Sequence, residues 1–281
     1  PTSNRSEGLA ELMLDAVSKL DVPLSLEQLL QWHRWLFPEE AGLLYRVRVG
    51  ALRGEEPMQV VSGRLDRPTV HFEAPPRSEL GQELGRFIEW FNSTQRDLEV
   101  DPLLRAAITH FWFVTLHPFD DGNGRLTRAL TDRALAQADN LSVRLYAMSS
   151  VILEKRQEYY RALECSQRGG VDITEWIVWF LQTLEAALDE ALTRIERTLA
   201  KARFWRRHQA DGLSTEQVKV LNRLLDGEFE QGINASKYRA AAKVSKATAT
   251  RHLTDLLEKE CLEKLPGGGR STRYRIRYPD E

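Results

Sequence analysis

Cysteine and long apolar runs are scarce in this sequence. Only Cys165 and Cys261 occur among 281 residues, far apart and with no other Cys or His at the spacing of metal ligands. We therefore expect no disulfide framework, no zinc site and a reducing compartment. No apolar run reaches the ~18 residues that a transmembrane helix needs, so we expect no contact with a membrane. Residues 1–5 lack an apolar signal core and an initiator methionine, which predicts a cytoplasmic protein and leaves residues upstream open.

Charge is unevenly distributed along the chain. The net charge is -2, but residues 201–281 carry 17 Lys and Arg against 11 Asp and Glu, a balance of +6, and the preceding 200 residues have a balance of -8. At roughly 100–200 residues per domain, this length predicts two domains. A mildly basic C-terminal part joined to an acidic main part indicates two kinds of partner. The polar stretch Gln209–Gly212 is the expected boundary, which gives domains 1–208 and 209–281.

Most of the first 208 residues have the periodicity of amphipathic helices. Ser25 and Gln28 form a capping-box pattern at the start of one of them. The expected helices cover residues 9–20, 25–38, 79–90, 102–117, 124–135, 151–165 and 172–207. Residues 45–76 differ, because Val47–Val49 and Thr69–Phe72 alternate apolar and polar side chains and are separated by Gly, Pro and Asp. We interpret this stretch as a short β-hairpin or flap inside a helical domain.

One segment, residues 117–128, concentrates groups that suit phosphate chemistry; its sequence is HPFDDGNGRLTR. A helix is expected to end near His117, and a glycine-flanked turn then leads into a new helix. Such a turn lets backbone N–H groups converge on one point, where the helix N-terminus adds partial positive charge. Arg125 and Arg128 are three residues apart and can project from one helix face, which suits a polyphosphate. Asp121 offers a hard oxygen ligand for Mg²⁺, and His117 can take a proton from an incoming hydroxyl.

These residues match the Fic motif, His-x-Phe-x-Asp/Glu-Gly-Asn-Gly-Arg-x-x-Arg, at every specified position, and the chain resembles the Fic family. The resemblance extends over residues 1–200 and includes Leu24–Phe37, Phe111–Phe113 and Tyr159–Leu163. It implies a mainly α-helical catalytic domain with a small β-hairpin flap. It also implies a protein adenylyltransferase that uses ATP as co-substrate together with Mg²⁺ or Mn²⁺.

The resemblance implies a role for each motif residue. His117 would deprotonate the hydroxyl of a Ser, Thr or Tyr on a target protein, which then attacks the α-phosphorus of ATP. Phe119 would pack inward, and Asp121 would hold the metal ion against the α- and β-phosphates. The anion hole and the ligands of the outer phosphates would be Gly122, Asn123, Gly124, Arg125 and Arg128.

Three further groups of residues take roles from the same resemblance. The flap residues would pair with the target as an added strand, and they are Val70, His71, Phe72 and Glu73. The adenosine contacts would be Tyr159, Tyr160 and Gln167. The inhibitory motif would consist of Ser3, Glu7 and Gly8, with Glu7 paired to Arg128 so that ATP binds in an unproductive pose. Two other interpretations of Glu7 stay open: it completes a capping box with Asn4, or it helps to hydrolyse AMP from targets.

The C-terminal part has its own pattern. Residues 213–225, 234–242 and 245–260 are expected helices, and 261–265 and 273–277 flank a glycine-rich tip. Three helices followed by a basic hairpin resemble a winged helix-turn-helix domain. The candidate contacts to double-stranded DNA are Lys246, Thr248, Thr250, Arg251, Arg273 and Arg275. Two alternatives stay open: the domain binds a protein, or the hairpin is an edge strand protected by its charge.

The leading hypothesis is therefore AMP transfer from Mg-ATP to a protein hydroxyl, restrained by Glu7, with the protein itself among its substrates. One alternative is a DNA-binding regulator in which the Fic-like part is a sensor or control module. Another keeps the fold and changes the phosphate-linked group that is transferred. A homodimer is an expected assembly, whereas the target protein and the DNA sequence are not specified by these residues.

Overall fold

The computed structural model describes residues 4–38, 47–64, 67–139, 147–209, 211–266 and 272–278. The chain forms two compact units, Pro1–Leu188 and Asp189–Glu281, and the division falls within the long helix α8 (Thr174–Arg207). The sequence predicted a boundary between residues 208 and 209, just after the end of α8. The structure divides the chain earlier, between Leu188 and Asp189. No helix in the described part of the chain is long and apolar enough to cross a membrane.

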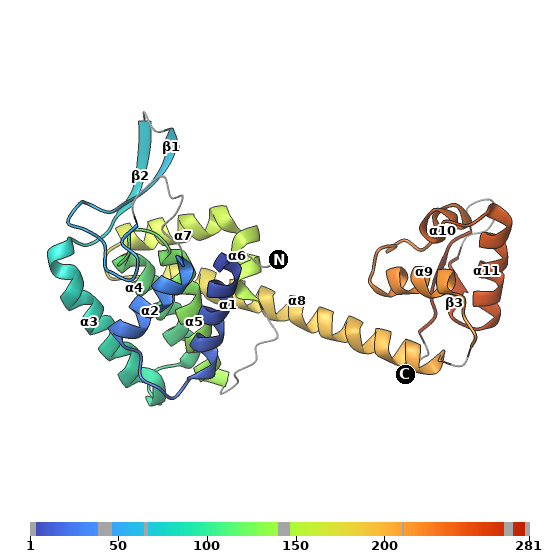
Figure 1. Ribbon diagram of the computed structural model, residues 1–281, viewed down its shortest axis with the longest axis horizontal. Helices are drawn as coiled ribbons and strands as arrows, with labels where there is room; N and C mark the ends of the chain where they lie inside the picture. Colours follow the sequence, from blue (N-terminus) through green and yellow to red (C-terminus); the bar gives the residue numbers. More distant parts are fainter. Residues whose placement is uncertain are drawn as a thin grey trace. The chain divides into compact units, whose positions relative to one another are not determined.

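The first unit is a bundle of helices around the pair α4 (Pro102–Leu116) and α5 (Asn123–Asp139) (Figure 1). Asp101 caps α4 by accepting bonds from two backbone N–H groups of its first turn, and Pro102 occupies the first helical position, where no N–H donor is needed. Buried side chains line most of α4, including Ala106, Ala107 and Phe113, because other helices cover it on several sides. The surrounding helices are α1 (Asn4–Ser18), α2 (Leu26–Leu36), α3 (Arg77–Ser93), η1 (Thr94–Arg96), α6 (Met148–Glu154), α7 (Arg156–Arg168) and the first part of α8.

A two-stranded antiparallel hairpin extends from this helical body (Figure 1). Its strands are β1 (Gln59–Arg64) and β2 (Arg67–Glu73), with Gln59 opposite Glu73 and Arg64 opposite Arg67. The expected flap is therefore present, but the expected first strand, Val47–Val49, is wrong. Val47 and Val49 pack instead against the apolar core of the first unit, so their alternation reflects burial and not strand pairing.

The expected helix 151–165 is interrupted. The structure has two helices there, α6 and α7, which meet at Lys155 with φ -94° and ψ 30°. The other expected helices of this unit are confirmed, with ends that differ by a few residues. Ser25 caps α2 as expected, since its hydroxyl accepts the backbone N–H of Gln28 at 3.2 Å.

The second unit has its own apolar core. It contains α9 (Thr215–Leu225), α10 (Ala235–Ala242), α11 (Lys246–Glu258) and the antiparallel pair β3 (Leu262–Lys264) and β4 (Tyr274–Ile276). Phe204, on the last turns of α8, is buried among Val220, Tyr238 and other residues of these elements. The sequence predicted all three helices and both strands here, because each is short, regular and bounded by polar or glycine-rich turns.

Candidate active site

The loop between α4 and α5 carries the predicted motif. His117 ends α4 in the left-handed conformation, with φ 46° and ψ 57°. Gly122 has φ +86°, and a Cβ there would also lie 3.1 Å from the Phe37 ring and 3.3 Å from the Leu36 side chain. Both the backbone conformation and the close approach of α2 therefore require glycine at this position.

The side chain of Asn123 closes the loop on itself. Its Oδ1 accepts the backbone N–H of Phe119 at 2.9 Å, and its Nδ2 donates to the Phe119 carbonyl at 2.7 Å. Because this side chain is buried and both its oxygen and its nitrogen bond to the Phe119 backbone, it fixes the loop. An anion at this point would meet backbone N–H groups at the start of α5, which have no partner within the helix.

His33 on α2 supports the loop from one side, and sequence reasoning missed it. Its ring stacks on Phe119, with centroids 4.3 Å apart and planes at 11°. The backbone N–H of Gly50 donates to Nδ1 at 2.9 Å, so Nε2 carries the ring proton and donates to the Asp121 carbonyl at 3.1 Å. Burial lowers the pKa of His33, which keeps the ring neutral and preserves this tautomer.

Arg53 supports the loop from the other side and was also missed. Its Nε donates to the His117 carbonyl at 2.9 Å, and its backbone N–H donates to the Pro118 carbonyl at 2.9 Å. Arg77 in turn donates to the Arg53 carbonyl at 2.8 Å. Nothing in the sequence marks Arg53 as a contact of the loop, because it is 64 residues away from His117.

The contacts of His117 leave one ring nitrogen available as a base. Nδ1 lies 3.1 Å from the Val114 carbonyl, which can only accept, so Nδ1 carries the proton and Nε2 has the free lone pair. Burial is the main cause that lowers the pKa of His117 below its ordinary value of 6.5, and Arg53 acts in the same direction. The imidazole is therefore neutral at neutral pH and able to accept a proton.

A cavity of about 710 Å³ lies beside His117. The predicted site residues that line it are Phe72, His117, Gly124, Arg128, Tyr159, Tyr160 and Gln167. Its walls thus come from β2, the motif loop, α5 and α7, which are far apart in sequence. Two cations that sequence reasoning missed, Arg156 and Arg161, also line it and add positive charge that suits a phosphorylated ligand.

Arg128 and Arg125 diverge from the start of α5. The guanidinium of Arg128 bends back over Gly124, where a Cβ would lie 3.4 Å from its NH1. Arg125 does not line the cavity; its guanidinium lies 4.8 Å from the centre of the Phe37 ring and 3.4 Å from the Asp121 carboxylate. The structure therefore places Arg128 at the cavity and Arg125 beside Phe37 and Asp121.

The two motif aspartates have different surroundings. Asp120 accepts hydrogen bonds from the backbone N–H of Arg48 at 3.0 Å and from its guanidinium at 3.1 Å. The Asp121 side chain is 57% exposed, and one of its oxygens accepts the backbone N–H of Gly122. Asp121 is thus the motif carboxylate open to solvent, and a single carboxylate that leaves other positions to phosphate and water fits Mg²⁺.

A buried hydrogen-bond chain connects the motif helix to the cavity wall. His110 Nδ1 bonds Thr131, whose hydroxyl donates to the Thr127 carbonyl, so Nδ1 donates and Nε2 accepts from the Tyr159 hydroxyl at 3.1 Å. Burial lowers the pKa of His110 to about 3, so the ring stays neutral. The Tyr159 hydroxyl therefore already donates its proton to His110. The side chain of Gln167, another predicted adenosine contact, also has a partner in the protein, because it donates to the Thr115 hydroxyl at 3.0 Å.

The remaining predicted residues of the first unit are placed as follows. Val70 is 39% exposed, and its carbonyl accepts from Arg168 on α7 at 3.3 Å. Glu73 accepts a bond from Gln59 across the hairpin at 2.8 Å. Ser3 and the side chain of His71 lie outside the described residues. Glu7 is exposed on the first turn of α1, whereas Gly8 is buried against α2.

The candidate DNA contacts of the second unit are on its surface. Lys246, Thr250 and Arg251 are exposed on α11. The hydroxyl of Thr248 lies 2.9 Å from the hydroxyl of Ser245, which caps that helix. On β4 and the residue before it, Arg275 donates to Glu263 and Arg273 donates to Gln231, so both guanidinium groups have partners within the unit.

Known proteins are similar to part of this chain. Residues 23–135 match the Fic/DOC family. "Protein adenylyltransferase fic-1" of Caenorhabditis elegans is 30% identical over 178 residues, which is 61% of this chain and 29% of the relative. "Protein adenylyltransferase Fic" of Drosophila grimshawi is 28% identical over 177 residues, with 62% and 31% covered. The chain thus spans about a third of the length of these relatives.

Solved structures with a similar fold are also Fic proteins. A Fic family protein from Desulfovibrio desulfuricans has a TM-score of 0.52 at 21% identity, covering 100% of this chain and 78% of that one. A Fic domain containing signalling protein from Bacteroides thetaiotaomicron has a TM-score of 0.52 at 19% identity, covering 68% of each chain. At these identities the likeness concerns the fold alone. It supports the expectation of a mainly helical Fic fold with a small strand pair.

Proposed function

We propose that this protein transfers AMP from ATP to a hydroxyl side chain of a target protein, including its own chain. The observation that carries the proposal is the cavity in which His117, Gly124, Arg128 and the aromatic wall of α7 meet. The similarity of 61% of the chain to named protein adenylyltransferases supports the same activity. The substrate residue is a Ser, Thr or Tyr presented along β2.

In the proposed reaction the chain mainly positions the reactants. The target hydroxyl oxygen attacks the α-phosphorus of ATP while its proton passes to Nε2 of His117. The bond from the α-phosphorus to the bridging oxygen breaks, and pyrophosphate leaves. Arg128 and the first N–H groups of α5 hold the phosphates, and Tyr160, 46% exposed beside the cavity, offers a ring for the base.

We propose that Asp121 holds Mg²⁺ beside the phosphates. When bound, the ion would neutralise charge on the phosphate oxygens and make the α-phosphorus more electrophilic. Asp121 suits this role because its side chain is 57% exposed and its neighbour Asp120 is already paired with Arg48.

We propose that Glu7 restrains the reaction by pairing with Arg128. The first turn of α1 packs closely on α2, since a Cβ on Gly8 would lie 1.8 Å from the Trp35 carbonyl oxygen. Helix α1 also packs on α5, which carries Arg128. A glutamate beside that arginine would compete with the terminal phosphate of ATP for the guanidinium group.

The test uses ATP labelled on its α-phosphate, with Mg²⁺ and a cell lysate as a source of targets. We expect label on protein with wild type, more label with Glu7→Gly, and none with His117→Ala. The Gly variant removes the carboxylate from an exposed position, so it leaves the apolar core intact. Absence of label from every sample would reject AMP transfer and favour another donor or a regulatory role. Equal labelling by wild type and Glu7→Gly would reject the restraint alone.

For the second unit we propose a winged helix-turn-helix domain that contacts double-stranded DNA through α11. Helices α10 and α11 are joined by a tight turn in which Lys243 has φ 56° and Ser245 caps the next helix. The exposed Lys246 and Arg251 support contact with phosphate oxygens, whereas Arg273 and Arg275 would first have to give up their hydrogen bonds to Gln231 and Glu263.

Fluorescence anisotropy with labelled duplex DNA at two salt concentrations tests this interface. It compares wild type, Arg251→Ala and, as a control in the first unit, Arg96→Ala. Binding that is absent at low salt, or equal in wild type and Arg251→Ala, would reject the proposed interface.

A further inference from the structure

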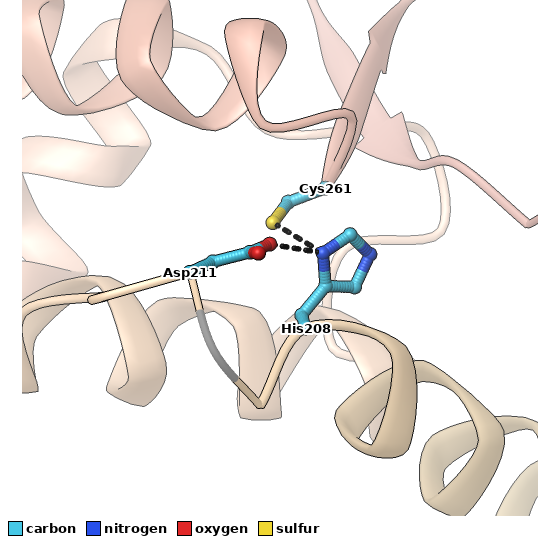
Figure 2. Close-up of side chains that lie close together, drawn as sticks. All are labelled: His208, Asp211 and Cys261. Atoms are coloured by element: carbon cyan, nitrogen blue, oxygen red, sulfur yellow. Dashed lines mark hydrogen bonds and ion pairs between the residues drawn. The ribbon is translucent and has the colours of Figure 1, made fainter.

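Three side chains of the second unit meet at one point, although two of them are 53 residues apart (Figure 2). His208 directly follows α8, Asp211 lies in the turn that follows, and Cys261 directly precedes β3. One ligand atom from each, an imidazole nitrogen, a carboxylate oxygen and the sulfur, lies within 4.8 Å of the other two. Nδ1 of His208 is 2.6 Å from Asp211 Oδ2 and 3.4 Å from Cys261 Sγ.

The backbone holds these groups in place. Cys261 is fully buried, with its N–H bonded to the Leu256 carbonyl and its own carbonyl accepting from Arg277. His208 is 5% exposed, and its ring packs on Phe204 with centroids 4.5 Å apart. The Asp211 side chain is 27% exposed and provides the side of the cluster that is open to water. The three donor atoms are therefore preorganised and reachable.

The geometry is not that of a Cys-His-Asp nucleophile. In such a relay the carboxylate contacts one ring nitrogen and the nucleophile contacts the other. Here the carboxylate and the sulfur both contact Nδ1 of His208 (Figure 2). Burial also raises the pKa of the Cys261 thiol to about 11, whereas a reactive cysteine needs a lowered one.

We propose that His208, Asp211 and Cys261 bind a divalent metal ion of the zinc class. Nitrogen, oxygen and sulfur donors from His, Asp and Cys are the ligands that Zn²⁺ takes in proteins, and water can fill the fourth position. In the metal-free state one proton on Nδ1 lies between the carboxylate and the sulfur, which is the place an ion would take. The partly exposed Asp211 side chain gives an ion access from solvent, and a pocket of about 590 Å³ borders His208.

Charges around the cluster are mixed. Arg207 lies near the thiol, and it is paired with Glu260 at 2.9 Å. Lys259 is also near and is paired with Asp255 at 2.8 Å. Because Arg207 and Lys259 are each paired with another carboxylate, neither of them is paired with Asp211. The Asp211 carboxylate can therefore attract the metal ion.

Binding has a defined proton balance. The ion takes the lone pair of His208 Nδ1, while the Cys261 thiol gives one proton to solvent and becomes a thiolate. At least one proton is therefore released per ion, so the affinity should rise as the pH rises. The bound ion would connect the end of α8 to the start of β3 and stabilise the second unit.

The experiment titrates the full chain, freed of metal with a chelator, with Co²⁺ as a spectroscopic substitute for Zn²⁺. We expect an ultraviolet thiolate-to-cobalt charge-transfer band that saturates at one equivalent and disappears when Zn²⁺ is added. The chain has two cysteines, and the exposed Cys165 provides a matched control. Cys165→Ser should keep the band and Cys261→Ser should lose it. Cobalt at Asp121 cannot produce this band, because no sulfur is part of that site.

A second measurement covers the case in which Cys261→Ser does not fold. Zn²⁺ should raise the urea midpoint of the second unit in wild type, and Asp211→Asn, which leaves both buried ligands in place, should reduce that shift and weaken Co²⁺ binding at least tenfold. No charge-transfer band in wild type would overturn the proposal. Loss of the band in Cys165→Ser, or unchanged binding in Asp211→Asn, would overturn it equally.

Discussion

At the scale of single residues, the proposed role of His117 as the base predicts a pH profile. Burial holds the pKa of His117 below 6.5, so the neutral base predominates at pH 7 and persists to lower pH. The rate of AMP transfer at saturating ATP should therefore be nearly constant from pH 7 to 8. It should fall about tenfold per pH unit once the pH is below that pKa. A rate that still rises steeply above pH 7 would show that another group is the base.

His33 acts on the site through the loop. The variant His33→Phe keeps a ring against Phe119 but leaves the Gly50 N–H and the Asp121 carbonyl without their partner. We expect the free energy of unfolding of the first unit to fall by about 1–3 kcal/mol. Label transfer should fall as well, because the loop loses its support.

Urea unfolding followed by circular dichroism measures this change. Arg96→Ala is the control, since its ion pair with Asp21 is exposed on both sides and contributes less than about 1 kcal/mol. If His33→Phe unfolds at the same urea concentration as that control, the two hydrogen bonds do not stabilise the loop.

At the scale of elements, two glycines in helices should respond in opposite ways to alanine. Gly8 packs α1 on α2, and its new Cβ would lie 1.8 Å from a backbone oxygen that no rotamer change can move. Gly8→Ala should therefore displace α1 and lower the free energy of unfolding by about 1–3 kcal/mol. Since α1 carries the proposed restraint, transfer of AMP should increase. A Cβ added to Gly81 on α3 would meet no atom within 4 Å apart from its chain neighbours and its own helix backbone, so Gly81→Ala should stabilise the protein by about 0.4–1 kcal/mol.

The two variants share the same gain in helix propensity, so a comparison of their unfolding midpoints isolates the contact between α1 and α2. Equal stabilisation by both would mean that α1 does not pack on α2 as described. A destabilised Gly8→Ala without increased labelling would separate the packing of α1 from any role in restraint.

At the scale of the whole molecule, the chain has two separate apolar cores, so we expect its two units to unfold separately. Leu221 is fully buried in the core of the second unit, and the core of the first unit is a different set of residues. Leu221→Ala should lower the stability of the second unit by about 2–5 kcal/mol and leave the first unchanged. Calorimetry of the full chain should show that only the transition of the second unit shifts in this variant. Added ATP, which we expect to bind and stabilise the first unit, identifies the transition of that unit. A common shift of both transitions would mean that the units unfold together.

The chemistry that the sequence determined by itself lies within twelve contiguous residues. His117, Asp121 and the glycines that follow are neighbours in the chain, so their local conformation already brings an imidazole, a carboxylate and helix N–H groups together. The helices were predictable for a related reason, because helical periodicity is a local property. The hairpin was predictable as an element, but the alternation at Val47–Val49 came from burial, which a local pattern does not distinguish from strand pairing.

Tertiary structure decided the contacts that join distant segments. His33 and Arg53 reach the motif loop from α2 and the chain that follows it, and Arg156 and Arg161 enter the cavity from α7. Cys261 has no Cys or His at ligand spacing in the sequence, yet the fold brings it to His208 and Asp211. These contacts have no sequence signal because side-chain packing between elements, and not chain proximity, determines which of many buried or charged residues meet.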